Sequence, residues 1–332
     1  MTSDAGPILV GDVGGTNVRF AMAAVGGDRV EISRTWKRSG DAFPTFEAAV
    51  LGYLEWSGAR PAGAAFGLAG AVVEGQVRML HRDWSADRSA LAELLGVERV
   101  VVVNDFQAMA RAAPELGAAD ADDIAPGLAD PSGSIVVTGP GTGFGVAVLR
   151  QLMSVEDRRH CWIVLGGEGG HQAFAPQTAI EWELALNLRR QFGYVSNEMV
   201  ASGSGFEATL RALAAVMGLA CPHLTPEAVI ERAGRGDALC LEMCRLRART
   251  VMTSAGDTAL LSNATGGVFL GGGVSLRIAP WLTEREALDR FYARGVRSEL
   301  MSAIPVKLIT ADTAPLIGAA WLWLDERERG WL

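Results

Sequence analysis

One acidic side chain stands beside a glycine-rich turn near the start of the chain. Residues 8–23 read ILVGDVGGTNVRFAMA, in which two apolar runs flank the turn Gly14-Gly15-Thr16-Asn17 and Asp12 precedes it. A carboxylate can hold a magnesium ion directly or through water, and glycine amides and the Thr16 hydroxyl can bind phosphate oxygens. The segment indicates a magnesium-nucleotide site, and an ordinary hairpin with a Gly-Gly turn is the alternative interpretation.

Two better-known phosphate loops do not fit this segment. The Walker spacing is absent, because the two lysines of the chain, Lys37 and Lys307, follow no glycine loop. A dinucleotide-binding turn requires G-x-G-x-x-G before a helix. Here the apolar run Val18–Val25 continues as a strand would.

The same arrangement recurs in the second half of the chain. Ser134–Val137 reads as a strand, TGPGTGFG follows at 138–145, and Val146–Leu149 reads as the next strand. The hydroxyls of Thr138 and Thr142 and the glycine amides can donate to phosphate. A third glycine-rich strand end, GGVFLGGGVS, occupies 266–275. The repetition favours a phosphate-binding role over plain turns and predicts two related halves with a cleft between them.

Asn104 and Asp105 follow an apolar strand and precede a helix. The four valines of Val100–Val103 indicate a parallel strand, and Asp105–Ala113 has helical composition. Ligands of α/β folds bind at the carboxyl ends of parallel strands. Asp105 can accept the proton of an attacking hydroxyl and Asn104 can orient that substrate, whereas both residues are also common helix N-caps.

A loop at 166–171, GGEGGH, presents an acid and a base among four glycines. Glu168 and His171 can hydrogen-bond to sugar hydroxyls. A surface loop with a satisfied histidine is the alternative, and a zinc site would need a cysteine cluster that does not follow. Glu198, in YVSNEMVASGSG, can also bind a ligand or be a solvated glutamate at a helix start.

The bulk composition excludes several classes of protein. A chain of 332 residues with 49% hydrophobic and 20% charged residues predicts two domains and a packed core. The net charge of −8 argues against a nucleic-acid partner. No run approaches the length of a membrane span, and the start lacks a basic region, so we expect a cytoplasmic protein. The four cysteines have no metal-binding spacing and are expected to be reduced.

Strand and helix signals alternate around these motifs. Strands are expected at Arg29–Thr35 and Ala62–Leu68, and Pro114–Pro131 is expected to be the crossing into a second domain. The expected helices have apolar residues at helical spacing. They cover Phe43–Trp56, Arg88–Leu95, Glu181–Phe192, Glu207–Met217, the long region Pro226–Leu261, and Pro315–Trp323, which is expected to pack back on the first domain.

These motifs together resemble those of the bacterial glucokinases, in the actin/Hsp70/hexokinase superfamily. The resemblance is to the type without the zinc-binding CxCGxxGC motif and runs from Ile8 to about Leu324. It rests on GDVGGTNVRF, VVVNDFQAMARA, TGPGTGFGVA, GGEGGHQAFAP, YVSNEMVASGSG, ATGGVFLGGGV and IPVKLITADTAPLIGAA. NDF and GEGGH, in this order and spacing, are its most specific parts.

The resemblance implies a fold, a reaction and partners. The implied fold is a two-domain α/β, actin-like ATPase (ribonuclease H-like) fold with an interdomain cleft. A small domain would cover 1–112 and be completed by the C-terminal helix 316–332, and a large domain would cover 113–315. The implied reaction phosphorylates D-glucose at its 6-hydroxyl with ATP and Mg²⁺, and closure would exclude water. The resemblance favours a homodimer.

The resemblance also implies a role for each candidate residue. Asp105 would be the general base for the sugar 6-hydroxyl, and Asp12 would help to hold Mg²⁺. Asn104, Glu168, His171 and Glu198 would bind the other hydroxyls of glucose. The nucleotide-binding residues would be Asp12, Gly14, Gly15, Thr16, Asn17, Gly141, Thr142, Gly143, Gly271, Gly272 and Gly273.

Three segments depart from the family pattern. Gly166 stands where proline is usual, Gln172-Ala173 replaces the usual Val-Asp, and ASGSGF at 201–206 replaces LSGPGL. These changes lie near the predicted sugar site and bear on hexose selectivity. The alternatives are therefore a kinase for mannose or fructose, a sugar-sensing regulator, and an actin-like ATPase without a sugar substrate.

Overall fold

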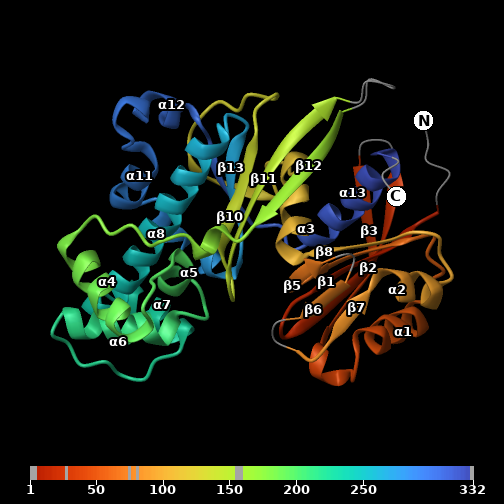
Figure 1. Cartoon of the computed structure of the whole chain (residues 1–332), viewed down its shortest axis with the longest axis horizontal. Helices are drawn as coiled ribbons and strands as arrows, with labels where there is room; N and C mark the ends of the chain where they lie inside the picture. Colours follow the sequence, from red (N-terminus) through yellow and green to blue (C-terminus); the bar gives the residue numbers. More distant parts are fainter. Residues whose placement is uncertain (1–5, 27–28, 74–75, 80–81, 154–159, 330–332) are drawn as a thin grey trace. The chain divides into compact units, whose positions relative to one another are not determined.

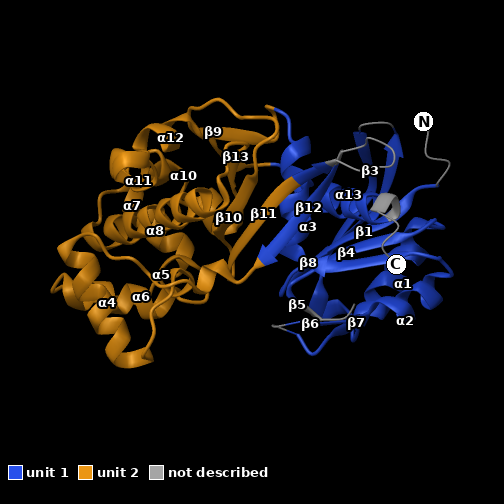
Figure 2. Cartoon of the chain, turned by 45° about the horizontal axis from the view of Figure 1, so that its top comes forward, with its two compact units in different colours: residues 1–117, 151–166, 311–332 blue, residues 118–150, 167–310 orange. Residues whose placement is uncertain are grey.

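The computed structural model of the chain describes residues 6–26, 29–73, 76–79, 82–153 and 160–329. Its contacts form two compact units (Figure 2). Unit 1 comprises Met1–Gly117, Gln151–Gly166 and Ala311–Leu332, and unit 2 comprises Ala118–Arg150 and Gly167–Thr310. The domain boundaries expected from the sequence stay a prediction, because these units are groups of mutual contacts.

The main sheet of unit 1 is built on the predicted hairpin (Figure 1). β1 (Ile8–Val13) pairs antiparallel with β2 (Asn17–Gly26), which pairs with β3 (Arg29–Ser39). On its other side β1 pairs parallel with β4 (Ala64–Leu68), and β4 pairs parallel with β8 (Val100–Asn104). The strand order is β3-β2-β1-β4-β8, and the expected strands are confirmed.

Both faces of this sheet are buried, as the continuous apolar strands require. Leu9 and Val13 pack in one cluster with side chains of α1 (Phe46–Ser57) and α2 (Arg88–Leu95). Ile8 and Val10 pack on the other face with α3 (Asp105–Ala112) and α13 (Ala314–Arg329). The C-terminal helix therefore packs on α3 and β1 of unit 1, as its apolar pattern predicts.

Short elements complete unit 1. A three-stranded meander joins β4 to α2. The remaining elements are β5 (Gly70–Val73), β6 (Gln76–Met79), β7 (Ser85–Asp87), β12 (His160–Gly167, to Gly166 in unit 1) and the 3-10 turns Gly40–Ala42 and Ala113–Glu115.

The sheet of unit 2 repeats the central pattern of unit 1. β10 (Ile135–Pro140) pairs antiparallel with β11 (Phe144–Met153) and parallel with β13 (Gly267–Leu270), which pairs parallel with β14 (Val306–Ile309). Within unit 2 the strand order is β11-β10-β13-β14-β9. Its edge strand β9 (Ala121–Ala125) lies inside the segment expected to be only a crossing.

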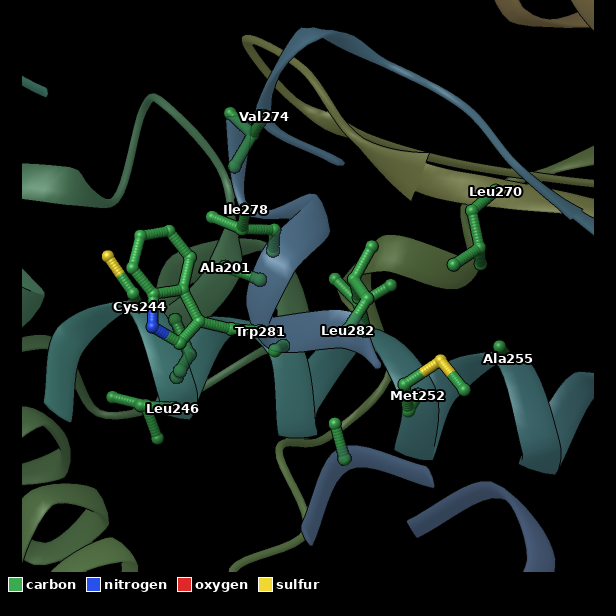
Figure 3. Packing of buried hydrophobic residues seen from close by; sticks show 14 of the residues in the cluster. Ala201, Cys244, Leu246, Met252, Ala255, Leu270, Val274, Ile278, Trp281 and Leu282 are labelled. Carbon is green, nitrogen blue, oxygen red and sulfur yellow. The ribbon is translucent and has the colours of Figure 1, made fainter. Parts of the chain in front are cut away.

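The long helix α8 (Ala238–Ser262) is the centre of the unit 2 core. The helical region expected over Pro226–Leu261 is two helices, because Gly236 adopts a φ of 86° before α8 begins. Figure 3 shows Trp281 and Leu282 packed over α8, beside Cys244 and Met252. The other helices and turns are α4 (Ala179–Phe192), α5 (Asn197–Ala201), α6 (Phe206–Val216), α7 (Pro226–Gly234), α9 (Gly273–Arg277), α10 (Ala279–Leu282), α11 (Arg285–Tyr292), α12 (Ser298–Ala303) and the 3-10 turns Gly169–His171 and Gly295–Arg297.

Candidate functional site

Asp12 lies near the end of β1, directly opposite Arg19 on β2. Its carboxyl is half-buried, and burial raises its pKa, although the charges of Arg19 and Lys37 lower it. The turn after it is closed by a hydrogen bond of 3.0 Å from Gly14 N to Asn17 O. The hairpin interpretation is therefore correct as geometry, and it places one carboxylate beside exposed or half-buried turn residues.

Arg82 holds this turn through hydrogen bonds to its backbone carbonyls. Its Nε donates to Gly15 O at 2.8 Å and its Nη2 to Thr16 O at 3.2 Å, while Asp41 pairs with the guanidinium at 2.9 Å. Holding two carbonyls of the turn fixes the orientation of its peptide groups. Arg82 is not among the residues expected from the sequence, since nothing in its neighbourhood links it to a turn more than sixty residues earlier.

Asn104 is the N-cap of α3. Its Oδ1 accepts from Phe106 N at 2.9 Å, its Nδ2 donates to Gly70 O at 3.1 Å, and Gln107 completes a capping box. The capping alternative is thus realised. It leaves one N–H of the amide for a ligand.

Asp105 is the first residue of α3 and is half-buried. Its Oδ1 accepts from Phe106 N at 2.8 Å, and no hydrogen bond to its other carboxylate oxygen is present among the described residues. Burial and the nearby charge of Asp12 raise the pKa of Asp105 to about 6. Unit 1 therefore brings Asp12 and Asp105 within electrostatic reach of each other. The carboxylate of Asp105 is more basic than that of an ordinary aspartate.

Two glycines allow the start of α3 to be packed in this position. A Cβ at Gly67, on β4, would lie 2.9 Å from Ala108 Cβ and 3.2 Å from Asp105 Cα. A Cβ at Gly166 would lie 2.3 Å from Nε2 of Gln107, the capping-box residue. The departure at Gly166 is therefore accommodated by a side chain that supports Asn104.

In unit 2 the second glycine turn lies against the third. Gly141 N donates to Gly143 O at 2.8 Å, and Thr138 Oγ1 donates to Gly145 O at 3.1 Å. Gly271 N donates to Thr138 O at 2.9 Å. Gly141–Gly143 and the start of Gly271–Gly273, both expected to bind nucleotide, are therefore neighbours at the ends of β10 and β13.

Glu198 reaches the same turn from α5. Its Oε2 accepts from Phe144 N at 2.9 Å, and its Oε1 lies 3.8 Å from His171 Nε2. His171 is held in place because Tyr194 Oη donates to its carbonyl at 2.8 Å and Asn197 N donates to Gln172 O at 3.0 Å. The departure Gln172-Ala173 thus contributes backbone contacts that bring His171 to Glu198.

Glu168 precedes the 3-10 turn that ends at His171, and its side chain is exposed. Its carbonyl accepts from His171 N at 3.0 Å. Glu168, His171 and Glu198 therefore all belong to unit 2, whereas Asn104 and Asp105 belong to unit 1.

Within the described ranges, the structure offers neither a ready-made metal cluster nor a membrane-spanning helix. There, no three His, Cys, Asp or Glu side chains form a group that could hold a metal ion by themselves. No helix in the described part of the chain has the length and apolar character needed to cross a membrane.

Comparison with known proteins gives consistent matches over nearly the whole chain. A family model described as Glucokinase matches residues 9–326. The glucokinase of Caulobacter sp. strain K31 is 36% identical over 313 residues, covering 94% of this chain and 93% of that protein. The "bifunctional protein glk" of Burkholderia lata is 39% identical over 324 residues, which are 97% of this chain but 49% of that protein. The chain thus spans about half the length of that relative.

Among solved structures, the glucokinase from an Antarctic psychrotroph superposes with a TM-score of 0.85. It is 34% identical, and the match covers 96% of this chain and 99% of that one. The expected two-domain, actin-like α/β fold class is thereby confirmed.

Proposed function

The chain belongs to the glucokinase family, and on this premise we propose that it transfers the γ-phosphoryl group of ATP to the 6-hydroxyl of D-glucose. The products are glucose 6-phosphate and ADP. The bond between the sugar 6-oxygen and phosphorus forms as the bond from phosphorus to the β–γ bridging oxygen breaks. The protein must position the two substrates, accept the hydroxyl proton and stabilise the charge on the phosphoryl group.

The observation that carries this proposal is the environment of Asp105. A general base works best when its pKa lies near the working pH, and the pKa of this carboxyl is raised to about 6 by burial and by Asp12. One carboxylate oxygen is fixed by the Phe106 N–H, which orients the other for a substrate hydroxyl. In this proposal the 6-hydroxyl proton passes to that second oxygen.

The sugar is held, in this proposal, by the remaining residues of the family pattern. Asn104 offers its free amide N–H, while Glu168, His171 and Glu198 offer acceptors and donors for vicinal hydroxyls. The 3.8 Å approach of His171 to Glu198 supports a joint role, because two such groups can bind adjacent hydroxyls.

The nucleotide phosphates are assigned to the glycine turns of the two units. The first is Gly14–Asn17, braced by Arg82, and the second is Gly141–Gly143 with Gly271–Gly273 beside it. Asp12 fits a Mg²⁺ role, since this ion keeps several waters and is bound through one or two carboxylates together with substrate phosphates. When bound, the ion would neutralise charge on the phosphates.

A coupled assay for sugar-dependent ADP release tests the proposal. The wild-type chain should release ADP with glucose, and Asp105→Asn should bind glucose but lose turnover by roughly 10²–10⁴-fold, the usual contribution of a general base. Near-normal turnover in Asp105→Asn would remove Asp105 from the base role. ADP release without any sugar would instead favour an actin-like ATPase.

The same assay separates glucose from other hexoses. The departures at Gly166 and Gln172-Ala173 adjoin residues assigned to the sugar, so a panel of glucose, mannose and fructose is required. Glucose should give the highest kcat/KM. A higher value for mannose or fructose would retain the reaction class and replace the substrate.

A further inference from the structure

Two arginines of α8 are buried in the same helix but have different partners. Arg247 and Arg249 are each 4% exposed. Arg249 contacts three carboxylates, those of Glu181, Glu242 and Glu286. Arg247 has no ion pair among the described residues. A buried cation without a counter-charge is costly, so its retention needs a physical reason.

The contacts of Arg247 lead toward the second glycine turn. Its Nη2 donates to Ser202 O at 2.8 Å, its Cζ lies 5.1 Å from the centre of the Phe206 ring, and its buried Nε has no hydrogen-bond partner. The acceptor belongs to the segment ASGSGF, which departs from the family pattern. The guanidinium is therefore fixed on one peptide group, that between Ser202 and Gly203.

This peptide group continues the contact to the turn. Gly203 N donates to Gly141 O, and Ser204 N donates to Thr142 O, both at 2.9 Å. The next peptide groups of the turn are those from Gly141 to Thr142 and from Thr142 to Gly143. Their carbonyls both point to the segment 203–204, since both are hydrogen-bonded by it.

The amides of the turn must point the other way. All described peptide bonds are trans, and in a trans peptide the C=O and N–H directions are opposed. The N–H groups of Thr142 and Gly143 therefore point away from the segment 203–204. Neither N–H makes a hydrogen bond to any part of the chain that the structure describes. Successive free amides of this kind form an anion-binding concavity.

We propose that Arg247 is a positioning residue for the nucleotide, acting through the Ser202–Gly203 peptide on the Thr142 amide. This inference rests on the proposed function, because it assigns the anion to the phosphates of the nucleotide. The guanidinium, the Ser202–Gly203 peptide and the Gly141–Thr142 peptide are aligned head to tail. Hydrogen bonds in such chains polarise one another.

Bound phosphate supplies the counter-charge that Arg247 lacks. In the low dielectric of the core, the charge of Arg247 acts on the phosphates over a longer range than the charge of a surface arginine would. Arg249 cannot act in this way, because carboxylates already offset its charge. The free enzyme bears the cost of the unpaired cation, and the cost is relieved when the nucleotide binds.

The test compares ADP with adenosine, which lacks phosphates. Titration calorimetry on Arg247→Met should show a Kd for ADP raised about tenfold or more, the effect of losing one hydrogen bond to a charged group. The Kd for adenosine and the KM for glucose should be unchanged. The Tm of Arg247→Met should stay close to that of wild type, because replacing an unpaired buried charge by an apolar side chain of similar volume is often neutral.

Two further variants complete the experiment. Arg247→Lys keeps the charge and should restore most of the ADP affinity. Arg247→Gln removes the charge and should raise the Kd for ADP as Arg247→Met does, so it carries the test if Arg247→Met does not fold. Arg294→Met is the matched control, since Arg294 donates to the backbone carbonyl of Thr253, also on α8, at 2.9 Å but has no contact with the 202–204 segment. It should leave the Kd for ADP unchanged.

Equal weakening of ADP and adenosine, or an unchanged Kd for ADP in folded Arg247→Met, would overturn the inference. Failure of the proposed function would look different: the wild-type chain would bind ADP but would release no ADP from ATP with any hexose. A wild-type chain that binds neither ADP nor adenosine would contradict both.

Discussion

Replacing Asp105 by Asn should stabilise the folded chain while it removes turnover. The pKa of the Asp105 carboxyl is raised from 3.8 to about 6 by burial and by the charge of Asp12. The folded state therefore disfavours the ionised carboxylate that a general base must have. Asn removes this charge and keeps an oxygen that can accept from Phe106 N, so the start of α3 need not change.

The sign of the effect follows from proton linkage. Between pH 3.8 and about 6 the folded state binds more protons than the unfolded state, so the free energy of unfolding falls as pH rises. Above about pH 6 the free energy of unfolding falls no further on account of this carboxyl, and the loss of stability is complete. It amounts to about 3 kcal/mol at most, because each pKa unit corresponds to about 1.4 kcal/mol.

The assay is calorimetric unfolding of wild type and Asp105→Asn from pH 4 to 7.5. The Tm of the variant should exceed that of wild type by at least about 2 °C at pH 7.5, on the usual scale for units of this size. The difference should shrink toward zero near pH 4. A variant less stable than wild type at pH 7.5, or a difference independent of pH, would refute the reasoning on Asp105.

Three other changes test separate parts of the structure. In the coupled assay, kcat/KM for glucose should fall about tenfold per pH unit below about pH 6, the pKa of Asp105, and a flat profile down to pH 5 would argue against this base. Gly67→Ala should lower kcat by roughly 10–100-fold, since its Cβ would displace Asp105 and small misplacements are costly; an unchanged kcat would mean that α3 tolerates the shift. Glu181→Gln should lower the free energy of unfolding by about 3–5 kcal/mol in denaturant titrations, as breaking a buried ion pair does, because Glu181 is 1% exposed and binds Arg249 and Arg290; a loss below about 1 kcal/mol would show that these arginines find other partners.

The buried network around Glu181 has a direct electrostatic signature. Burial alone raises the pKa of this carboxyl, yet the Gln177 N–H and the two guanidiniums outweigh burial and hold its pKa below the usual range. The charged form is thus the one that the fold requires. This distinguishes Glu181 from Asp105, whose charged form the fold opposes.

The elements that could be predicted from sequence are those with strong local signals. Four consecutive valines identify β8, and the glycine turn between apolar runs identifies β1 and β2. β9 could not be predicted, since Asp122 and Asp123 give it low strand propensity. These exposed charges suit an edge strand, and its pairing with β14 depends on residues far away in sequence.

The candidate site shows the same division between local and distant causes. Asp105 and Glu198 belong to motifs whose residue types indicate chemistry by themselves. Arg82 and Arg247 lie in segments without such a pattern, and their importance arises only from contacts with carbonyls more than forty residues away. A single sequence carries no signal for a side chain that acts on another segment's backbone.

Asn104 illustrates why capping and catalysis need not be competing interpretations. Its side chain accepts from Phe106 N and donates to Gly70 O, so it holds the start of α3 against the meander strand β5. Asp105 is fixed by the same Phe106 N–H. If the helix began one residue earlier or later, the direction of the carboxylate would differ by about 100° around the helix axis. The N-cap is therefore what gives Asp105 its direction, and substrate binding by the remaining amide N–H of Asn104 is an addition to that structural role.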